Sequence, residues 1–198
     1  MAYLAERRQG WMLSRIRFSF LRPLPTLGGT IAVETYPVGF HRRLFALREF
    51  IFRDGDGREW AVGSSWWILV ELERLRPLEL PAALAVDLPD NSARRRFFPE
   101  LEKFAPPAGE IRWRHIVPES GIDVNGHWNN AEYAALVHDF LARSRKTAGE
   151  LKEIQLNFLQ GALAGEELAL TGALTGTEFE FGGSRDGKAV FAARGWFK

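Results

Sequence analysis

The chain has 198 residues, and 46% of them are hydrophobic, which allows a substantial core and disfavours an intrinsically disordered chain. Its formal net charge of +1 provides no bulk attraction to nucleic acid or to an anionic membrane. Cysteine is absent, which excludes disulfides, cysteine-ligated metals and a thiolate nucleophile, so an enzyme built on this chain must attack with a hydroxyl, a carboxylate or water.

Alternation of hydrophobic and polar residues dominates the first part of the chain and predicts an antiparallel meander. In the first of these segments, Ile16, Phe18 and Phe20 lie on one side of the predicted strand, and the residues between them are polar. The sequence DGDG at 54–57 marks a hairpin turn in the middle of the meander. The segments with this pattern are 15–21, 31–36, 43–52 and 58–73.

Segment 76–110 interrupts the strands and has the composition of an extended linker. It holds six of the ten prolines of the chain and a run of three arginines. We therefore predict three parts: an N-terminal unit at 1–80, a linker at 81–108 and a C-terminal unit at 109–198.

The second half of the chain repeats the strand pattern and adds a helix. Segment 129–145 predicts this helix because apolar residues such as Val137 and Phe140 recur at helical spacing. Asn129 or Asn130 is a suitable N-cap for it. The predicted strands of this half are 111–120, 153–159, 166–174, 176–183 and 185–196.

The two halves are related as copies of one unit. Aligned by eye, 15–21 corresponds to 153–159, and 56–66 corresponds to 186–196. The order of elements agrees as well, so we predict an internal duplication. Compared with the second copy, the first lacks its first strand and most of its helix, of which 3–13 would be the tail. We therefore expect that the chain starts late, by truncation or by a misplaced start codon.

The segment DVNGHWNN, residues 123–130, joins a predicted strand to the predicted helix and is rich in polar side chains. One interpretation is purely structural, because Asn125-Gly126 is a favourable tight-turn pair and Asp123 can brace the turn through its own backbone. A calcium loop is excluded, since the sixth and twelfth positions counted from Asp123 are a tryptophan and an alanine rather than a glycine and a glutamate.

Other kinds of site have no support in the sequence. The four histidines show no metal-ligand spacing, which disfavours zinc. The sequence has neither a Gly-x-Ser-x-Gly elbow for a serine hydrolase nor a glycine motif that cradles phosphate. We therefore expect no metal and no cofactor. We assign no role to His41 and His115, and we expect His138, inside the predicted helix, to be a packed or rim residue.

The segment 123–133, DVNGHWNNAEY, resembles the Asp-x-Asn-x-His-x-Asn-Asn-x-x-Tyr segment of the acyl-ACP thioesterases, where it stands in the second of two hotdog repeats. The stretch 11–50 is similar to the family's first repeat, with its Trp-x-Leu-x-Arg opening and Thr-Tyr-Pro-x-Gly turn. The stretch 64–77 looks like the family's Ser-x-Trp-x-Leu-Val strand, which ends in Arg-Pro. The resemblance implies an α+β fold of the tandem hotdog type, with antiparallel sheets that each wrap around a helix and with the first repeat incomplete here.

The resemblance also implies an activity: hydrolysis of acyl-ACP to a free fatty acid and ACP in fatty acid biosynthesis. It carries the catalytic roles onto Asp123, Asn125 and His127. The imidazole suits proton transfer near neutral pH, a carboxamide can position water, and the aspartate would fix the imidazole tautomer.

The next three residues, Trp128, Asn129 and Asn130, are the expected substrate-binding residues. The two asparagines would also cap and hold the helix, whose N-terminus could present N–H groups to the developing oxyanion. Trp128 either lines the mouth of an acyl tunnel or packs in the core.

One position departs from the family's pattern. The family's further acidic residue falls on Gly161 when the interval after the motif is aligned without a gap. Water activation would then rest on His127 and Asp123 alone. Two alternatives therefore stay open: an acyl-CoA thioesterase on the same fold, and a catalytically degenerate hotdog protein that binds acyl groups without cleaving them.

The implied partners are an acyl thioester and the acidic acyl carrier protein, which basic side chains could dock. The exposed edge of an incomplete repeat would favour a homodimer. Two basic clusters are candidates for docking, and both are equally consistent with a solvated linker and a solvated helix end: Arg94-Arg95-Arg96, and Arg143 with Arg145 and Lys146.

The sequence shows no sign of membrane insertion or export. No apolar run approaches the roughly 20 residues of a spanning helix. The first 13 residues lack the apolar core and the cleavage site of a secretory signal. We therefore expect a soluble cytoplasmic protein that neither spans a membrane nor binds nucleic acid.

Overall fold

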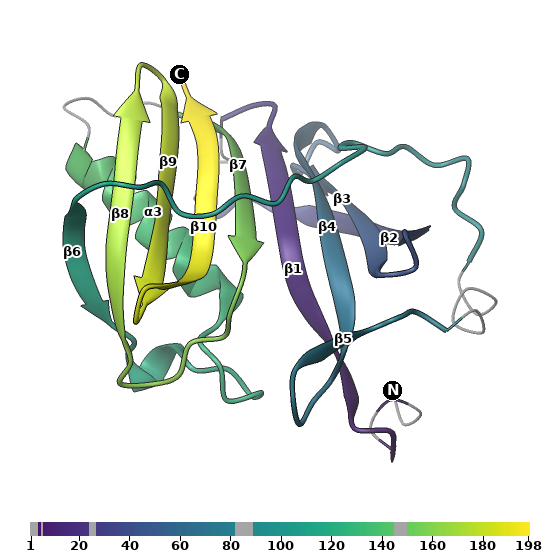
Figure 1. The fold of residues 1–198 in the computed structure, drawn as a ribbon. Helices are drawn as coiled ribbons and strands as arrows, with labels where there is room; N and C mark the ends of the chain where they lie inside the picture. Colours follow the sequence, from purple (N-terminus) through teal and green to yellow (C-terminus); the bar gives the residue numbers. More distant parts are fainter. Residues whose placement is uncertain (1–3, 5, 24–26, 82–88, 145–149) are drawn as a thin grey trace. The chain divides into compact units, whose positions relative to one another are not determined.

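The computed structural model describes residues 4, 6–23, 27–81, 89–144 and 150–198. The chain divides into two compact units, Met1–Leu101 and Glu102–Lys198 (Figure 1). Within each unit the strands pair antiparallel, and the expected α+β class is confirmed.

The first unit contains the predicted antiparallel strands, but only the second, third and fourth follow one another as a meander, because the first pairs with the fourth. Its strands are β1 (Gln9–Phe20), β2 (Ala32–His41), β3 (Phe45–Arg53), β4 (Glu59–Glu71) and β5 (Arg76–Leu78). They pair in the order β2-β3-β4-β1, and the short β5 pairs with β4. The β3–β4 hairpin turns at Asp54, whose Oδ1 accepts the N–H groups of Asp56 and Arg58 at 3.0 and 2.9 Å.

The expected helix tail at 3–13 is wrong over most of its length. Leu4 and Glu6 are helical, but β1 begins at Gln9 and pairs with β4 from there onward. Segment 9–13 is therefore held by pairing with residues about 60 positions away, which local helical spacing cannot anticipate.

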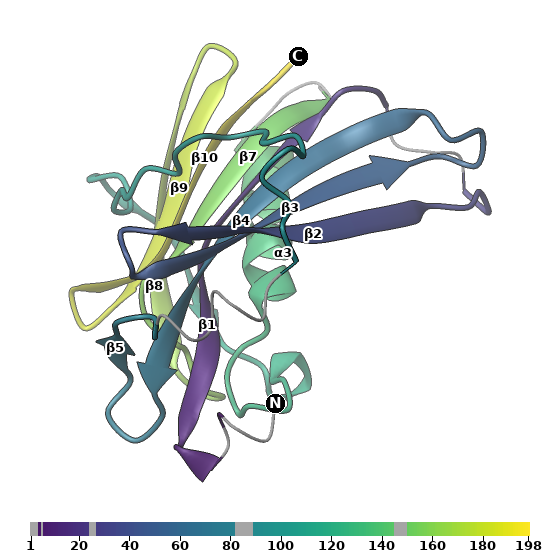
Figure 2. The same ribbon diagram turned by 90° about the vertical axis from the view of Figure 1, so that its right-hand side faces the viewer.

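The second unit wraps a sheet around a helix, as expected (Figure 2). Its elements are β6 (Ile111–Ile116), a 3-10 turn at Glu119–Gly121, α3 (Asn130–Ser144), β7 (Leu151–Phe158), β8 (Glu167–Thr175), β9 (Glu178–Arg185) and β10 (Lys188–Phe197). The strands pair in the order β7-β10-β9-β8-β6. The helix packs its apolar face on this sheet, with Phe140 stacked on Phe181 at 4.7 Å and Tyr133 edge to face with Phe191 at 4.9 Å.

The strand registers support the internal duplication. In the first unit Phe18 of β1 lies opposite Gly63 of β4, and in the second unit Leu156 of β7 lies opposite Ala193 of β10. The sequence alignment equates Phe18 with Leu156 and Gly63 with Ala193, so both pairs consist of equivalent residues. Equivalent strands therefore pair in equivalent register.

The two units differ in what covers the sheet. In the second unit Phe158 of β7 packs edge to face on Tyr133 of α3. In the first unit the corresponding face carries Phe18, which meets Phe50 and Phe52 at 6.2 and 5.7 Å. The described residues of the first unit include no counterpart of β6 or of the full helix α3.

The described part of the linker is fastened to both units along its length. In the first unit, the buried carboxylate of Glu49 accepts hydrogen bonds from the Ser64 hydroxyl and, at 3.4 Å, from the N–H of Phe97. In the second unit, Nε2 of Gln155 donates to the carbonyl of Glu102 at 2.7 Å. Residues 89–101 thus belong to the first unit, and the second begins at Glu102.

Candidate active site

The polar turn 123–130 lies between the 3-10 turn and α3 and is organised by Asp123. The N–H of Asp123 donates to the carbonyl of His127 at 2.8 Å, and Ile122 forms an isolated bridge with Trp128. Oδ1 of Asp123 accepts the N–H groups of Asn125 and His127 at 2.8 and 3.4 Å, and Oδ2 accepts the Asn125 amide at 3.3 Å. These hydrogen bonds hold the turn in one shape.

Gly126 supplies the unusual backbone conformation that this turn needs. Its φ of +76° lies in the left-handed region, which residues other than glycine adopt only with strain. Its N–H donates to the carbonyl of Asp123 at 3.0 Å and closes the turn. The structural interpretation of Asn125-Gly126 as a turn pair is thus correct, and it does not conflict with a catalytic one.

The imidazole of His127 is oriented by a backbone carbonyl. Its Nδ1 lies 3.1 Å from the carbonyl oxygen of Asn125. A carbonyl oxygen only accepts hydrogen bonds, so Nδ1 carries the proton, and Nε2 of the neutral ring has a free lone pair. The expectation that Asp123 fixes this tautomer directly is wrong, because its carboxylate is bonded to N–H groups of the turn. Asp123 acts one step back, by holding Asn125 in place.

Asp123 is suited to this structural task as an anion. Partial burial tends to raise its pKa, but the hydrogen bonds from Asn125 and His127 outweigh that effect and lower the pKa overall. The carboxylate is therefore ionised at neutral pH, and both of its oxygens act as acceptors for the turn.

Gly161 lies directly beside the imidazole of His127. A Cβ atom built on Gly161 would come within 2.5 Å of Cδ2 and 3.1 Å of Nε2 of the ring. The position that aligns with the family's acid thus does face the candidate site. Its glycine, however, is in such close contact with the ring that a side chain fits only if the ring or the loop moves.

The loop that carries Gly161 is joined to the turn by further contacts. The N–H of Trp128 donates to the carbonyl of Ala162 at 2.8 Å, and Ala162 is fully buried. The hydroxyl of Tyr133 is hydrogen-bonded to the backbone of Ala162, and burial raises the pKa of Tyr133 to about 12. Tyr133 is therefore neutral at physiological pH and anchors the loop as a hydrogen-bonding group.

The three expected substrate-binding residues occupy different environments. Asn129 is the N-cap of α3, since its Oδ1 accepts the N–H of Ala131 at 2.9 Å. Asn130 is the exposed first residue of the helix. Trp128 is only 3% exposed and packs between His115 and Tyr133, so the core-packing alternative describes it in this structure. Substrate contact by these residues stays a prediction.

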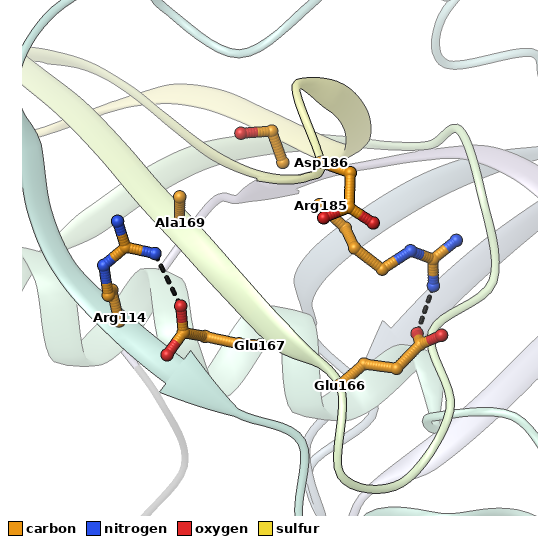
Figure 3. A pocket seen from close by; sticks show the side chains of 7 residues that line it. Arg114, Glu166, Glu167, Ala169, Arg185 and Asp186 are labelled. Atoms are coloured by element: carbon orange, nitrogen blue, oxygen red, sulfur yellow. Dashed lines mark hydrogen bonds and ion pairs between the residues drawn. The ribbon is translucent and has the colours of Figure 1, made fainter.

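Arg185, to which no sequence motif pointed, braces the loop beside His127. Arg185 ends β9, and its side chain is ion-paired with Glu166 and donates to the carbonyl of Gly161 at 3.2 Å. It lines a polar hollow of about 300 Å³, on whose other side Arg114 is ion-paired with Glu167 (Figure 3). No local pattern marks Arg185, because its partners lie 19 to 25 positions away.

Two arginines of the basic triplet form ion pairs within the first unit. Arg94 is ion-paired with Glu34 and lies over the Tyr36 ring, and Arg95 pairs with Glu59 at 2.8 Å. Arg94 and Arg95 are therefore ion-paired within the chain, which weakens the docking hypothesis for these two residues. In the other cluster, Arg143 lies over the Trp113 ring at 4.7 Å, and residues 145 and 146 lie outside the described part of the chain.

Two further features bear on the class of the protein. Within the described residues, no group of three or more His, Asp or Glu side chains is placed to hold a metal ion. None of the helices among those residues combines the length and the apolar character that crossing a bilayer requires.

Comparison with known proteins adds independent information. Residues 1–85 match the model of the acyl-ACP thioesterase N-terminal domain, and residues 110–186 match the model of the acyl-ACP thioesterase C-terminal domain. No protein of curated function matches the chain by sequence.

Solved structures show the same fold at low sequence identity. An acyl-ACP thioesterase from Bacteroides thetaiotaomicron is similar with a TM-score of 0.83 and 21% identity, over 100% of this chain and 80% of that one. The 12:0-ACP thioesterase from Umbellularia californica gives 0.80 and 20%, over 99% and 78%. A MaoC-like dehydratase from Phytophthora capsici gives 0.61 and 15%, over 95% and 72%, so the fold by itself does not fix the reaction.

Proposed function

Because the chain belongs to the acyl-ACP thioesterase family and is thus a thioester hydrolase, we propose that the turn 123–130 is its active site. The family's reaction is the hydrolysis of acyl-ACP to a free fatty acid and ACP. The observation that carries the proposal is the contact of His127 Nδ1 with the carbonyl of Asn125. In the neutral ring, this contact leaves a lone pair on Nε2 that can accept a proton from water.

His127 is the general base of the proposed reaction. Its Nε2 takes a proton from a water molecule while the water oxygen attacks the thioester carbonyl carbon. When the tetrahedral intermediate collapses, the C–S bond breaks, and the imidazolium returns the proton to the departing sulfur. A carboxylic acid and a thiol leave, and His127 is neutral again. The carbonyl of Asn125 stabilises the imidazolium through the Nδ1–H bond.

Asn125 and the start of α3 are the proposed donors to the developing oxyanion. Asn125 is exposed on the turn, and its amide is already oriented by Asp123. The helix begins at Asn130, so the positive end of its dipole and the N–H of Asn130 lie next to the same turn, while the N–H of Ala131 is bound by the cap. Asn129 supports this arrangement as the helix cap.

Gly161 is the observation that favours the second candidate, a hotdog protein that binds acyl groups without cleaving them. With glycine at this position, the residue that would correspond to the family's acid offers no carboxylate beside His127. The orientation of the imidazole favours the hydrolase, because a protein that only binds acyl groups does not need a histidine held in this way at the start of a helix.

The experiment that separates the candidates measures free thiol released from acyl-ACP and from acyl-CoA of the same chain length. The proposal expects cleavage of both with a higher kcat/KM on acyl-ACP. A higher kcat/KM on acyl-CoA indicates the acyl-CoA thioesterase. Absence of cleavage together with binding of the acyl ligands, measured by tryptophan fluorescence, indicates the binding protein.

The biological setting follows from the substrate. We place the reaction in fatty acid biosynthesis and in the cytoplasm, because the enzyme must share a compartment with acyl-ACP. Recognition of the acidic carrier protein is assigned to surfaces other than Arg94 and Arg95, which are ion-paired within the chain. The homodimer stays a prediction, which sedimentation of the purified protein can test.

A further inference from the structure

The His127 imidazole packs against the loop 160–166, which joins β7 to β8. Gly161 touches the edge of the ring that carries Cδ2 and Nε2. The place of the Gly161 backbone therefore limits where Nε2 can lie. On the side of the turn, the ring is held at Nδ1 by the carbonyl of Asn125. Two opposed contacts thus define its orientation.

One side chain holds both ends of this loop. Nη1 of Arg185 donates to the carbonyl of Gly161 at 3.2 Å, and Nη2 donates to Oε1 of Gln160 at 3.4 Å. The same guanidinium is ion-paired with Glu166, whose Oε2 accepts the N–H of Leu163 at 2.9 Å. Figure 3 shows Arg185 and Glu166 directed toward one another.

The guanidinium of Arg185 is well suited to this task. Arginine presents several donors in a fixed plane, so one group can bind a carbonyl, an amide oxygen and a carboxylate together. Its side chain is only 26% exposed, whereas that of Arg114 across the hollow is 58% exposed. Arg114 pairs with Glu167 and makes no contact with loop 160–166 among the hydrogen bonds of the described residues.

We propose that Arg185 is a positioning residue for His127: it fixes the backbone of Gly161 against the imidazole and so keeps Nε2 directed at the substrate. This proposal rests on the proposed function of His127. Arg185 touches neither the reacting atoms nor the imidazole. Gly161 occupies the position that aligns with the family's acid. In this chain the backbone of Gly161, held by Arg185, restrains the His127 ring by packing against it.

The test compares Arg185→Met, Arg185→Lys and, as the matched control, Arg114→Met. The first measurement is kcat and KM on acyl-ACP. The second is the imidazole ¹⁵N NMR spectrum of His127, assigned by its loss in His127→Ala. Circular dichroism and thermal unfolding establish that each variant is folded.

The expected result for Arg185→Met is a fall in kcat of about 10- to 100-fold with KM changed less than about twofold, because a small misplacement of a catalytic group acts on the chemical step. The ¹⁵N spectrum should change from one dominant tautomer to a mixture. The kcat of Arg185→Lys should lie between those of Arg185→Met and the wild type, because lysine keeps the ion pair with Glu166 but lacks the planar set of guanidinium donors. Arg114→Met should match the wild type in both measurements.

Three results would overturn the proposal: a wild-type kcat and spectrum in Arg185→Met, equal losses in the Arg114 and Arg185 variants, or a loss of kcat with an unchanged imidazole spectrum. If Arg185→Met does not fold, a wild-type kcat and spectrum in Arg185→Lys would overturn it. If the wild type cleaves no thioester, the proposed function fails, and the ¹⁵N spectra still decide whether Arg185 orients the ring.

Discussion

The imidazole of His127 rests on the backbone of Gly161, so closely that a Cβ atom at residue 161 would lie 2.5 Å from Cδ2 of the ring. Real Cβ atoms essentially never approach a neighbour that closely, so any other residue at 161 must displace either the ring or the loop. This contact explains why the position is glycine in a chain whose histidine is held by packing.

Gly161→Ala is therefore expected to lower activity by about 10- to 100-fold, because the added methyl group pushes the ring away from its contact with Asn125. The measurement is kcat on acyl-ACP, together with the thermal midpoint. Gly55→Ala is the matched control, since a Cβ atom there meets nothing within 4 Å. Full activity in Gly161→Ala would show that the ring is free to move.

An acid placed at this position should not improve the enzyme. In Gly161→Asp the carboxylate begins at the same crowded Cβ, so we expect a rate no higher than that of Gly161→Ala. A rate above that of the wild type would mean that the ring and the loop move easily to accept a side chain. Gly161 would then stand only for the loss of the family's acid, without a packing role.

Asn129 and Asn130 should differ in their effect on stability. Asn129→Ala removes the cap of α3 and is expected to cost about 0.5–2 kcal/mol in the free energy of unfolding. Asn130→Ala, which leaves that cap intact, should change it by no more than about 0.5 kcal/mol. Urea unfolding of the two variants checks this, and equal losses would contradict the assignment of the cap.

Asp123 should stabilise the fold only when it is ionised. Its pKa is lowered in the folded state, so its contribution is present above the unfolded value of 3.8 and is lost as the pH falls through the folded pKa. The stability difference between the wild type and Asp123→Asn should therefore shrink below pH 3.8. Urea unfolding at a series of pH values measures it, and a difference that grows on acidification would reverse the assignment.

The stability that Glu49 contributes should depend on pH in the opposite direction. Burial is the main cause of its raised pKa, and the bonds from Ser64 and Phe97 only partly offset it. A raised pKa means that stability is greatest below the unfolded value of 4.5 and is lost as the pH rises through the folded pKa. Compared with Glu49→Gln, the wild type should lose stability above pH 4.5, and a parallel pH dependence in both proteins would refute this.

Much of the fold could be predicted because its signals are local. Alternation in 15–21 and 153–159 predicted β1 and β7, and helical spacing with an asparagine cap predicted α3. The same local signals placed the polar turn at the start of the helix. The start of β1 at Gln9 could not be predicted, since it depends on pairing with Glu71.

The site was harder to predict, because its decisive contacts use the backbone or distant residues. The acceptor for His127 Nδ1 is the carbonyl of Asn125, which leaves no trace in the identity of the side chain. Arg185 and Arg94 look like solvated arginines in the sequence, but their partners lie up to 60 positions away. The hydrophobic pattern predicts which face a residue occupies and not which polar group it meets.

The role of His127 as the base in thioester hydrolysis is tested most directly by the rate of thiol release from acyl-ACP by His127→Ala. His138→Ala is the matched control, because His138 is an exposed histidine of the same unit on α3. We expect His127→Ala to stay folded and to lose at least about 100-fold in kcat, the lower range for general-base catalysis, whereas His138→Ala should keep the wild-type rate. A folded His127→Ala with the wild-type rate would contradict it.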